Sequence, residues 1–267
     1  MGRTSTPKPH PLTPSPRRGE GEHKEKSSRS SPLSALRRGG QGVRTRFTRK
    51  LLAWWARAAR DLPWRKTRDP YRVLVSEFML QQTQVTRVAE YYPRFLERFP
   101  DLETLASARP RAVREAWEGL GYYARARNLH SLAKDVTRRH DATLPSDPDE
   151  LIKLPGVGPY TAGAVASFAY EKPVPAVDTN VSRVLQRVFW GSNHTPRTTQ
   201  RVLWNLAAAL VPKRGKSAWK FNQAIMELGA LICVARNPKC PECPVLPVCR
   251  TGKARRTDAR KTRRTDA

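Results

Sequence analysis

The chain has 267 residues, enough for one large domain or two small ones with a sizeable core. Its 50 Lys and Arg residues outnumber its 23 Asp and Glu residues, giving a formal net charge of +27. About half of that excess lies in residues 1–45 and 250–267, so the body between them is basic too. This favours a polyanionic partner, bound less tightly as salt is added. No apolar run approaches the roughly 18 to 20 residues of a membrane-spanning helix, which argues against a membrane protein.

The two ends of the chain have little to bury. Residues 1–43 are rich in Pro, Ser, Gly and Arg and lack aromatic residues, so we predict a disordered basic extension. Glu20, Glu22 and Glu25 argue against a targeting peptide. Alternatively, the assigned start codon lies too far upstream and this segment is not made. Residues 251–267 predict a basic, disordered tail.

The first predicted helix begins near Arg44 and ends before Leu62 and Pro63. Apolar residues recur in it at helical spacing, which indicates an amphipathic helix. Trp64 and Arg65 follow in a loop. A tryptophan after a helix is either part of the core or part of a pocket, and the pattern alone leaves both open.

The second predicted helix carries a carboxylate among apolar residues. Asp69 is a predicted cap and Pro70 the first helical residue of a segment that runs from Tyr71 to Thr83. Glu77 lies at its centre, where desolvation would raise its pKa. A carboxyl group that stays protonated near neutral pH is suited to general acid catalysis. The alternative is an ordinary glutamate on the polar face of the helix.

Several more helical patterns follow with almost no alternating strand pattern, so we predict an all-α fold. Between two of them, residues 119–130 read GLGYYARARNLH. Paired glycines, paired tyrosines and two arginines suit a loop that enters a groove, with rings stacking on bases and guanidinium groups holding phosphates. The same letters also fit a helix start whose tyrosines lie in the core.

A helix-hairpin-helix is predicted around Leu154-Pro155-Gly156-Val157-Gly158. Two glycines one residue apart allow a tight turn. The backbone N–H groups of Gly156, Val157 and Gly158, and those at the start of the next helix up to Thr161, are then free to bind a phosphate near the positive helix end. A simple turn between packed helices is the alternative.

Asp178 precedes another apolar-periodic segment and is predicted to cap its helix. The helix end that accepts the carboxylate also favours its ionised form. Such an anion is suited to stabilising a cation that develops next to it.

All four cysteines lie within seventeen residues, with the spacing C-x6-C-x2-C-x5-C. Their clustering in a basic chain favours a metal site over disulfides. Four thiolates suit tetrahedral zinc or a [4Fe–4S] cluster, and the spacing does not choose between the two. The predicted ligands are Cys233, Cys240, Cys243 and Cys249.

These motifs resemble a known family. The hairpin at 154–158, Tyr160 and Asp178 look like the Gly/Pro-rich loop and catalytic aspartate of the helix-hairpin-helix DNA glycosylases. Residues 76–85, SEFMLQQTQV, resemble that family's catalytic-glutamate helix. Residues 119–130 are most similar to the MutY-type adenine glycosylases.

The resemblance covers roughly residues 47–249 and implies two helical subdomains with DNA in the groove between them. One would span 65–170 and end in the helix-hairpin-helix. The other would combine 44–64 with 171–250 and hold a structural [4Fe–4S] cluster. The family's further C-terminal domain, which recognises 8-oxoguanine, is not expected in the eighteen residues after Cys249.

The resemblance also implies roles for individual residues. Glu77 would protonate a flipped-out adenine and later help to activate water, while Asp178 would stabilise the oxocarbenium-like sugar. The remaining implied contacts are Tyr160 and Asn180 in the catalytic group, Trp64, Arg65, Leu80 and Glu227 around the base, and Gln82 and Tyr122 inserted into the DNA. Glu227 has the alternative of a satisfied glutamate on a helix surface.

Tyr160 stands where bifunctional relatives of the endonuclease III type carry a lysine, so the resemblance implies base removal without strand cleavage. We expect its hydroxyl to hydrogen-bond near Asp178. The family pattern is broken at Thr179, where glycine is usual, and this puts the identity of the base in doubt.

The expected reaction is therefore removal of adenine opposite 8-oxoguanine or guanine in mismatched double-stranded DNA. The expected protein is a monomer, cytoplasmic in a bacterium or nuclear in a eukaryote. One alternative is a thymine or uracil mismatch glycosylase on the same scaffold. Another is a non-catalytic DNA-binding module that uses only the hairpin and the basic surface.

Overall fold

The computed structural model describes residues 40–191 and 200–254, and the regular elements of these two ranges are all helical. The all-α prediction is confirmed for this part of the chain. The predictions for residues 1–39 and 255–267 lie outside it. None of the described helices is both long and apolar enough to cross a membrane.

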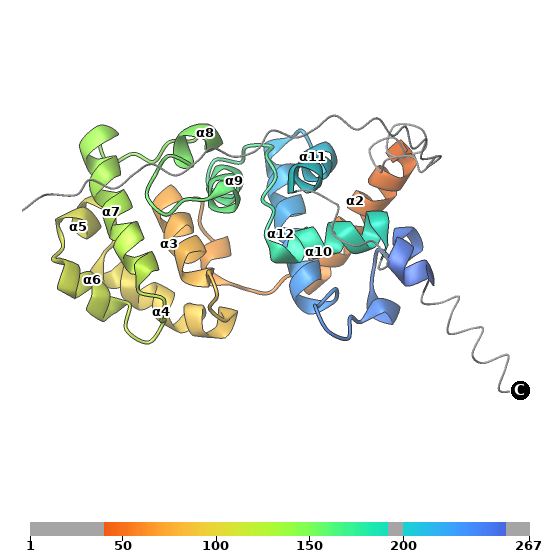
Figure 1. Cartoon of the computed structure of the whole chain (residues 1–267), viewed down its shortest axis with the longest axis horizontal. Coiled ribbons are helices and arrows are strands. Elements are labelled where there is room, and N and C mark those ends of the chain that lie inside the picture. Colours follow the sequence, from red (N-terminus) through yellow and green to blue (C-terminus); the bar gives the residue numbers. More distant parts are fainter. Residues whose placement is uncertain (1–39, 192–199, 255–267) are drawn as a thin grey trace, which may run out of the picture.

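The helices form two groups, one at each end of the elongated molecule (Figure 1). The first group contains α3 (Pro70–Leu80), α4 (Val85–Arg98), α5 (Leu102–Ser107), α6 (Pro110–Ala116), α7 (Ala124–Arg139), α8 (Pro148–Leu151) and α9 (Pro159–Phe168), preceded by the short η1 (Pro63–Arg65). The second contains α2 (Gly40–Ala58), α10 (Thr179–Leu185), η2 (Gln186–Trp190), α11 (Gln200–Leu210), α12 (Gly215–Leu231), η3 (Cys240–Glu242) and η4 (Leu246–Val248).

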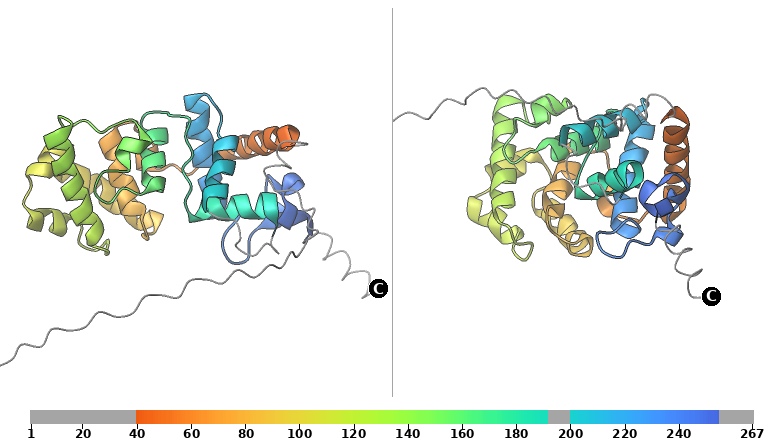
Figure 2. Two further views of the ribbon diagram at one scale, coloured as in Figure 1. Left: turned by 45° about the horizontal axis from the view of Figure 1, so that its top comes forward. Right: turned by 45° about the vertical axis from the view of Figure 1, so that its right-hand side comes forward.

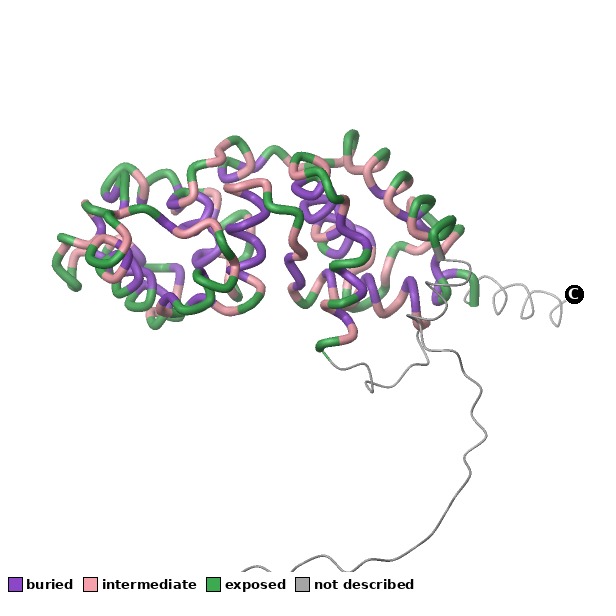
Figure 3. Tube along the Cα trace, turned by 90° about the horizontal axis from the view of Figure 1, so that it is seen from above, coloured by how far each residue is buried: buried purple, intermediate pink, exposed green. Residues whose placement is uncertain are grey.

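Each group has its own hydrophobic core. One cluster of buried side chains is built mainly from residues 62–176, and the other joins α2 to residues 177–249. The two groups are also apart in the left-hand view of Figure 2, and buried stretches run through both halves (Figure 3). On this basis we propose the division into a 65–170 subdomain and a subdomain formed by 44–64 with 171–250.

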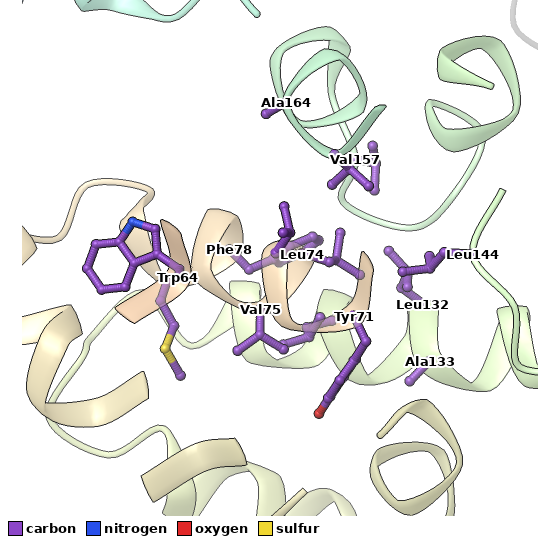
Figure 4. Close-up of a cluster of buried hydrophobic side chains, with 14 of the residues drawn as sticks. Trp64, Tyr71, Leu74, Val75, Phe78, Leu132, Ala133, Leu144, Val157 and Ala164 are labelled. Atoms are coloured by element: carbon purple, nitrogen blue, oxygen red, sulfur yellow. The ribbon is translucent and has the colours of Figure 1, made fainter. Parts of the chain in front are cut away.

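Helix α3 lies at the centre of the first core. Asp69 caps it, since the Asp69 Oδ1 atom accepts a 2.8 Å hydrogen bond from the Arg72 N–H, and Pro70 takes the first helical position, as predicted. Figure 4 shows Leu74, Val75 and Phe78 of this helix among side chains from α7 and the hairpin region. Because α3 is buried on nearly all sides, Glu77 is carried into the interior with it.

Helices α3 and α9 pack closely because α9 carries small residues. Gly163 is the tightest point on the other side of α9, where an added Cβ atom would lie 2.3 Å from the carbonyl oxygen of Pro175. This contact holds the strand-like segment before Asp178 against α9 and so fixes where Asp178 enters the second subdomain.

Both ends of the ordered body extend further than predicted. Helix α2 begins at Gly40 rather than near Arg44, and its first turn is largely exposed, so it left no apolar signal. Residues 251–254, at the start of the predicted tail, are helical rather than disordered. Thr251 is buried there, and its hydroxyl donates a 2.9 Å hydrogen bond to the carbonyl oxygen of Arg187.

Candidate active site

A cavity of about 870 Å³ lies between the two cores and brings the predicted acid and anion together. Glu77 and Tyr160 enter it from the first subdomain, whereas Asp178 and Asn180 enter it from the start of α10. The cavity is also lined by the other predicted pocket residues, Trp64, Arg65, Leu80, Gln82 and Glu227.

Glu77 is the buried carboxyl group of this cavity, with only 3% of its surface exposed. Its pKa is raised to about 7, mainly by burial and also by the nearby charge of Asp178, while a hydrogen bond from Tyr160 and the charge of Arg65 limit the rise. The predicted desolvation is therefore present. A carboxyl group with this pKa holds a proton near neutral pH and gives it up readily, as a general acid requires.

Tyr160 bonds to the acid rather than to the anion. Its hydroxyl donates a 2.7 Å hydrogen bond to Glu77 Oε2, in the cavity that Asp178 also lines. Burial, with the charges of Glu77 and Asp178, raises the pKa of the Tyr160 phenol well above its usual value. The phenol therefore keeps its proton and serves as a fixed hydrogen-bond donor to Glu77.

Asp178 is the N-cap of α10, as predicted. Its Oδ1 atom accepts a 2.6 Å hydrogen bond from the Val181 N–H, and its Oδ2 atom accepts one of 2.9 Å from the side-chain amide of Asn180. The Asn180 amide is oriented in turn by Arg183, which donates to its Oδ1 atom at 2.6 Å. These donors, together with the helix end, stabilise a negative charge on Asp178.

Glu227 is neither a surface glutamate nor a free acceptor for a base. Its side chain is fully buried, and its two oxygens accept hydrogen bonds from the backbone N–H and guanidinium of Arg60 and from the guanidinium of Arg65. Burial by itself would raise the pKa of Glu227, but these bonds lower it to about 2. Its oxygens are already satisfied, so its clearest role is to hold the two arginines.

Arg65 is held in the wall of the cavity by its hydrogen bonds to Glu227. Besides Glu227, it donates to Gln223 Oε1 at 2.8 Å and to the carbonyl oxygen of Arg60 at 3.1 Å. Sequence reasoning missed Arg60 and Gln223, since nothing in the local pattern marks a partner more than 150 positions away. Trp64 belongs both to the core and to the pocket, the two alternatives that the sequence left open, because it packs edge-on against Tyr92 and also lines the cavity.

The hairpin before α9 differs in detail from the prediction. Only Gly156 has a left-handed backbone, with φ of 75°, whereas Gly158 has φ of −94° and open space where a Cβ atom would lie. The side chains of Val157 and Thr161 are buried, and the Val157 N–H already bonds the Leu154 carbonyl. Within the described ranges, the N–H groups of Gly158, Tyr160 and Thr161 have no hydrogen-bond acceptor. These N–H groups, rather than side chains, are what the hairpin offers to a phosphate.

Two exposed residues with left-handed backbones project from neighbouring loops. Gln82 follows α3 with φ of 56°, and Tyr122 precedes α7 with φ of 46° and 63% of its surface exposed. Of the two arginines that the sequence offered for phosphates, Arg125, near Tyr122, is not available to DNA. This side chain is buried and bonded to carbonyl oxygens, because a buried guanidinium needs acceptors on all sides.

All four cysteines line one small cavity in the second subdomain, next to η3 and η4. Two of the sulfur atoms are approached by donors: the Gly252 N–H lies 3.3 Å from Cys249 Sγ, and Arg187 Nη1 lies 3.6 Å from Cys233 Sγ. In the described parts of the chain, no three His, Cys, Asp or Glu side chains are arranged to hold a metal ion. The common cavity and the N–H donors suit a thiolate-bound group.

Fold and site together define a helical protein in which a protonatable carboxyl group and an anchored carboxylate face one cavity beside a helix-hairpin-helix. Residues 75–209 match the model of the HhH-GPD superfamily of base excision DNA repair proteins. The chain belongs to this superfamily.

Relatives and solved structures agree with this assignment. The chain is 46% identical over 197 residues to the adenine DNA glycosylase of Mycolicibacterium smegmatis, which covers 73% of this chain and 66% of that protein. It superposes on a thermostable thymine-DNA glycosylase with a TM-score of 0.73 at 32% identity, covering 80% of this chain and 98% of that one. A non-covalent endonuclease III–DNA complex gives a TM-score of 0.69 at 27% identity, covering 81% and 98%. The chain spans just over a third to about two-thirds of the length of the curated relatives it matches.

Proposed function

We propose that the protein is a DNA glycosylase of base excision repair that removes adenine mispaired with 8-oxoguanine or guanine. The observation that carries this proposal is that Glu77 and Asp178, 101 positions apart in the sequence, face one cavity large enough for an extruded nucleoside. Curated relatives at 39–46% identity are named adenine DNA glycosylases, which supports adenine as the base.

The proposed reaction begins with the proton on Glu77. The target nucleotide leaves the base stack, since its glycosidic bond is otherwise inaccessible. Glu77 donates its proton to a ring nitrogen of adenine, and the bonding electrons leave with the base as the glycosidic bond breaks. Asp178, held as an anion, stabilises the positive charge left on the sugar. Water then adds to the sugar carbon, and its proton returns to Glu77.

Tyr160 supports hydrolysis without strand cleavage. Cleavage by an imine route needs an amine that attacks the sugar, and a phenol cannot form that imine. In this chain the Tyr160 hydroxyl is also committed to Glu77 Oε2. We therefore propose that water is the nucleophile and that the product is an abasic site.

DNA is proposed to lie across the hairpin and the cavity mouth. The free N–H groups of Gly158, Tyr160 and Thr161 would bind one phosphate at the positive end of α9. Gln82 and Tyr122 would enter the base stack from the two loops that carry them. The similar endonuclease III structure is a complex with DNA, which supports this partner.

We further propose that Cys233, Cys240, Cys243 and Cys249 hold a [4Fe–4S] cluster. Their common cavity and the N–H donors at two of the sulfurs support this assignment. When bound, the cluster would serve as a structural support for the loop that bears Arg236 and Lys239. Iron and sulfide assays on anaerobically purified protein test it, and stoichiometric zinc would refute it.

A second candidate is a thymine or uracil mismatch glycosylase. It is favoured by the similarity to the thymine-DNA glycosylase structure, which this chain matches over 98% of that chain's length. Single-turnover assays on duplexes containing A:8-oxoguanine, A:G, T:G and U:G separate the candidates after alkaline cleavage of the abasic product. Release of adenine supports the first proposal, and release of thymine or uracil supports the second. Binding without release of any base would indicate a non-catalytic module.

A further inference from the structure

Arg125 lies in the first turn of α7 with only 6% of its surface exposed. Its guanidinium reaches the C-terminal end of α3, where Nη1 donates to the carbonyl oxygens of Phe78 at 3.1 Å, Met79 at 2.7 Å and Gln81 at 2.5 Å. These carbonyls form the negative end of α3, so a cation is well placed there. These hydrogen bonds from Arg125 fix the backbone between Phe78 and Gln81, which leads directly into Gln82.

The same guanidinium holds the loop on its other side. Nη2 donates to the carbonyl oxygens of Leu120 and Gly121 at 3.0 Å each, and Nε donates to that of Tyr122 at 3.4 Å. Six carbonyl oxygens therefore share the five N–H donors of one arginine. In the described residues, Arg125 forms no ion pair.

The two segments held by Arg125 each carry an exposed residue in a conformation that side chains rarely adopt. Gln82 and Tyr122 both have positive φ and both project from the surface, while their neighbours Met79 and Leu120 are buried. A positive φ at a non-glycine residue is a cost that the surrounding contacts must offset. Arg125 supplies contacts to both segments at once.

We propose that Arg125 is a positioning residue that joins the Gln82 loop and the Tyr122 loop into one rigid unit, so that both side chains meet the DNA together. This rests on the proposed function, in which these two side chains enter the base stack. Lysine cannot replace arginine here, because its single ammonium group cannot reach carbonyls on both sides in the fork geometry. Coupling between the two loops should therefore depend on the guanidinium and not only on the positive charge.

A double-mutant cycle tests the proposal. Gln82→Ala, Tyr122→Ala and the double variant are compared for binding to a duplex with an uncleavable tetrahydrofuran abasic site, in the otherwise native chain and with Arg125→Lys. In the native chain, the double variant should lose at least about fivefold less affinity than the product of the single losses, because a rigid unit loses most of its benefit when either side chain is removed. With Arg125→Lys the losses should multiply to within about twofold, as expected for independent sites.

Non-additivity that persists unchanged with Arg125→Lys, or additive losses in the native chain, would overturn the proposal. Arg127→Lys is the matched control, since this exposed arginine lies two positions away on the same helix, and it should leave the coupling intact. The assay uses no base chemistry, so failure of the native protein to release adenine would refute the proposed function without touching this result.

A second measurement needs no variant and covers the case in which Arg125→Lys does not fold. The Thr83 N–H bonds the Leu80 carbonyl at 3.4 Å, and the Leu120 N–H bonds the Trp117 carbonyl at 3.1 Å. If the loops form one unit, native-state hydrogen exchange should give both amides the same opening free energy and the same dependence on denaturant. Clearly different opening energies would refute the proposal.

Discussion

Tyr160 and Glu77 lie 83 positions apart and are joined by a 2.7 Å hydrogen bond from the phenol to the carboxyl group. The bond favours the ionised carboxylate, because a charged acceptor gains more from a donor than a neutral one does. It therefore moderates the rise in the Glu77 pKa that burial causes. The two residues act as one unit that sets the pH range in which the proton is available.

Tyr160→Phe should shift the pH dependence of base release toward higher pH. Without the phenol, ionised Glu77 loses a donor and its pKa rises above its present value of about 7. If protonated Glu77 is the active form, the rate falls as pH rises through this pKa, and the fall should move upward. Single-turnover rates from pH 5 to 10 measure it. A fall that moves downward, or does not move, would contradict the pairing.

Glu77→Gln should abolish base release while leaving DNA binding intact. An amide has no proton of suitable acidity to give to a leaving base, and general acid catalysis is worth roughly 10²–10⁴-fold in rate. The measurement is single-turnover adenine release alongside affinity for the same mismatched duplex. Glu90→Gln, at an exposed position of α4, is the control and should retain the native rate. Near-native release by Glu77→Gln would remove the general-acid assignment.

The same substitution should also stabilise the fold at high pH. The pKa of Glu77 is raised to about 7 in the folded state from an ordinary value of 4.5. Below pH 4.5 the carboxyl group is protonated in both the folded and the unfolded state, and its burial costs no ionisation energy. As pH rises through about 7, the free energy of unfolding falls, because the unfolded state ionises more readily than the folded state. Above that range Glu77→Gln should be more stable than the native protein by on the order of 3 kcal/mol, and this gain should fade toward pH 4.5. Urea unfolding at pH 5 and pH 8.5 measures the difference. Equal differences at both values would contradict the raised pKa.

Much of this site follows from the sequence because its signals are local. The apolar residues around Glu77 indicate a carboxyl group at or beside an apolar face, with a polar-face glutamate left open, and the position of Asp178 before a periodic segment predicts its capping role. That both would face one cavity came from resemblance and not from periodicity. In the structure, the chain passes from the second core to the first after α2 and returns after α9, and this brings Glu77 and Asp178 to one cavity.

What the sequence could not show are partners that meet only in the fold. Arg125 is one basic residue among 50, and nothing local separates an arginine that holds phosphate from one that holds carbonyl oxygens. For Glu227 the sequence left open a pocket carboxylate or a helix-surface glutamate, because its arginine partners lie more than 160 positions away. In both cases the missing information is a long-range contact.

Glu227→Gln should destabilise the protein strongly. It leaves Arg60 and Arg65 without their shared carboxylate in a buried setting, and breaking a buried ion pair costs roughly 3–5 kcal/mol. The pKa of Glu227 is lowered to about 2, so this stabilisation is present above pH 4.5 and is lost as pH falls toward 2. Urea unfolding at pH 7 and pH 3 measures it. Glu115→Gln breaks only exposed pairs, with Arg98 and Arg111, and should destabilise the protein far less. A similar cost for the two variants would contradict the anchoring role.

The two hairpin glycines should respond differently to alanine. Gly156→Ala places a Cβ atom 2.6 Å from Asn128 Cβ at a φ of 75°, so it should destabilise the fold by roughly 1–3 kcal/mol. Gly158 has ordinary φ and open space, so Gly158→Ala should change stability by less than about 0.5 kcal/mol. The open space is where the phosphate would approach, and the added methyl group should weaken DNA binding about tenfold or more. Thermal unfolding and duplex binding, measured on both variants, separate the two effects. Native affinity in Gly158→Ala would mean that the phosphate is held elsewhere.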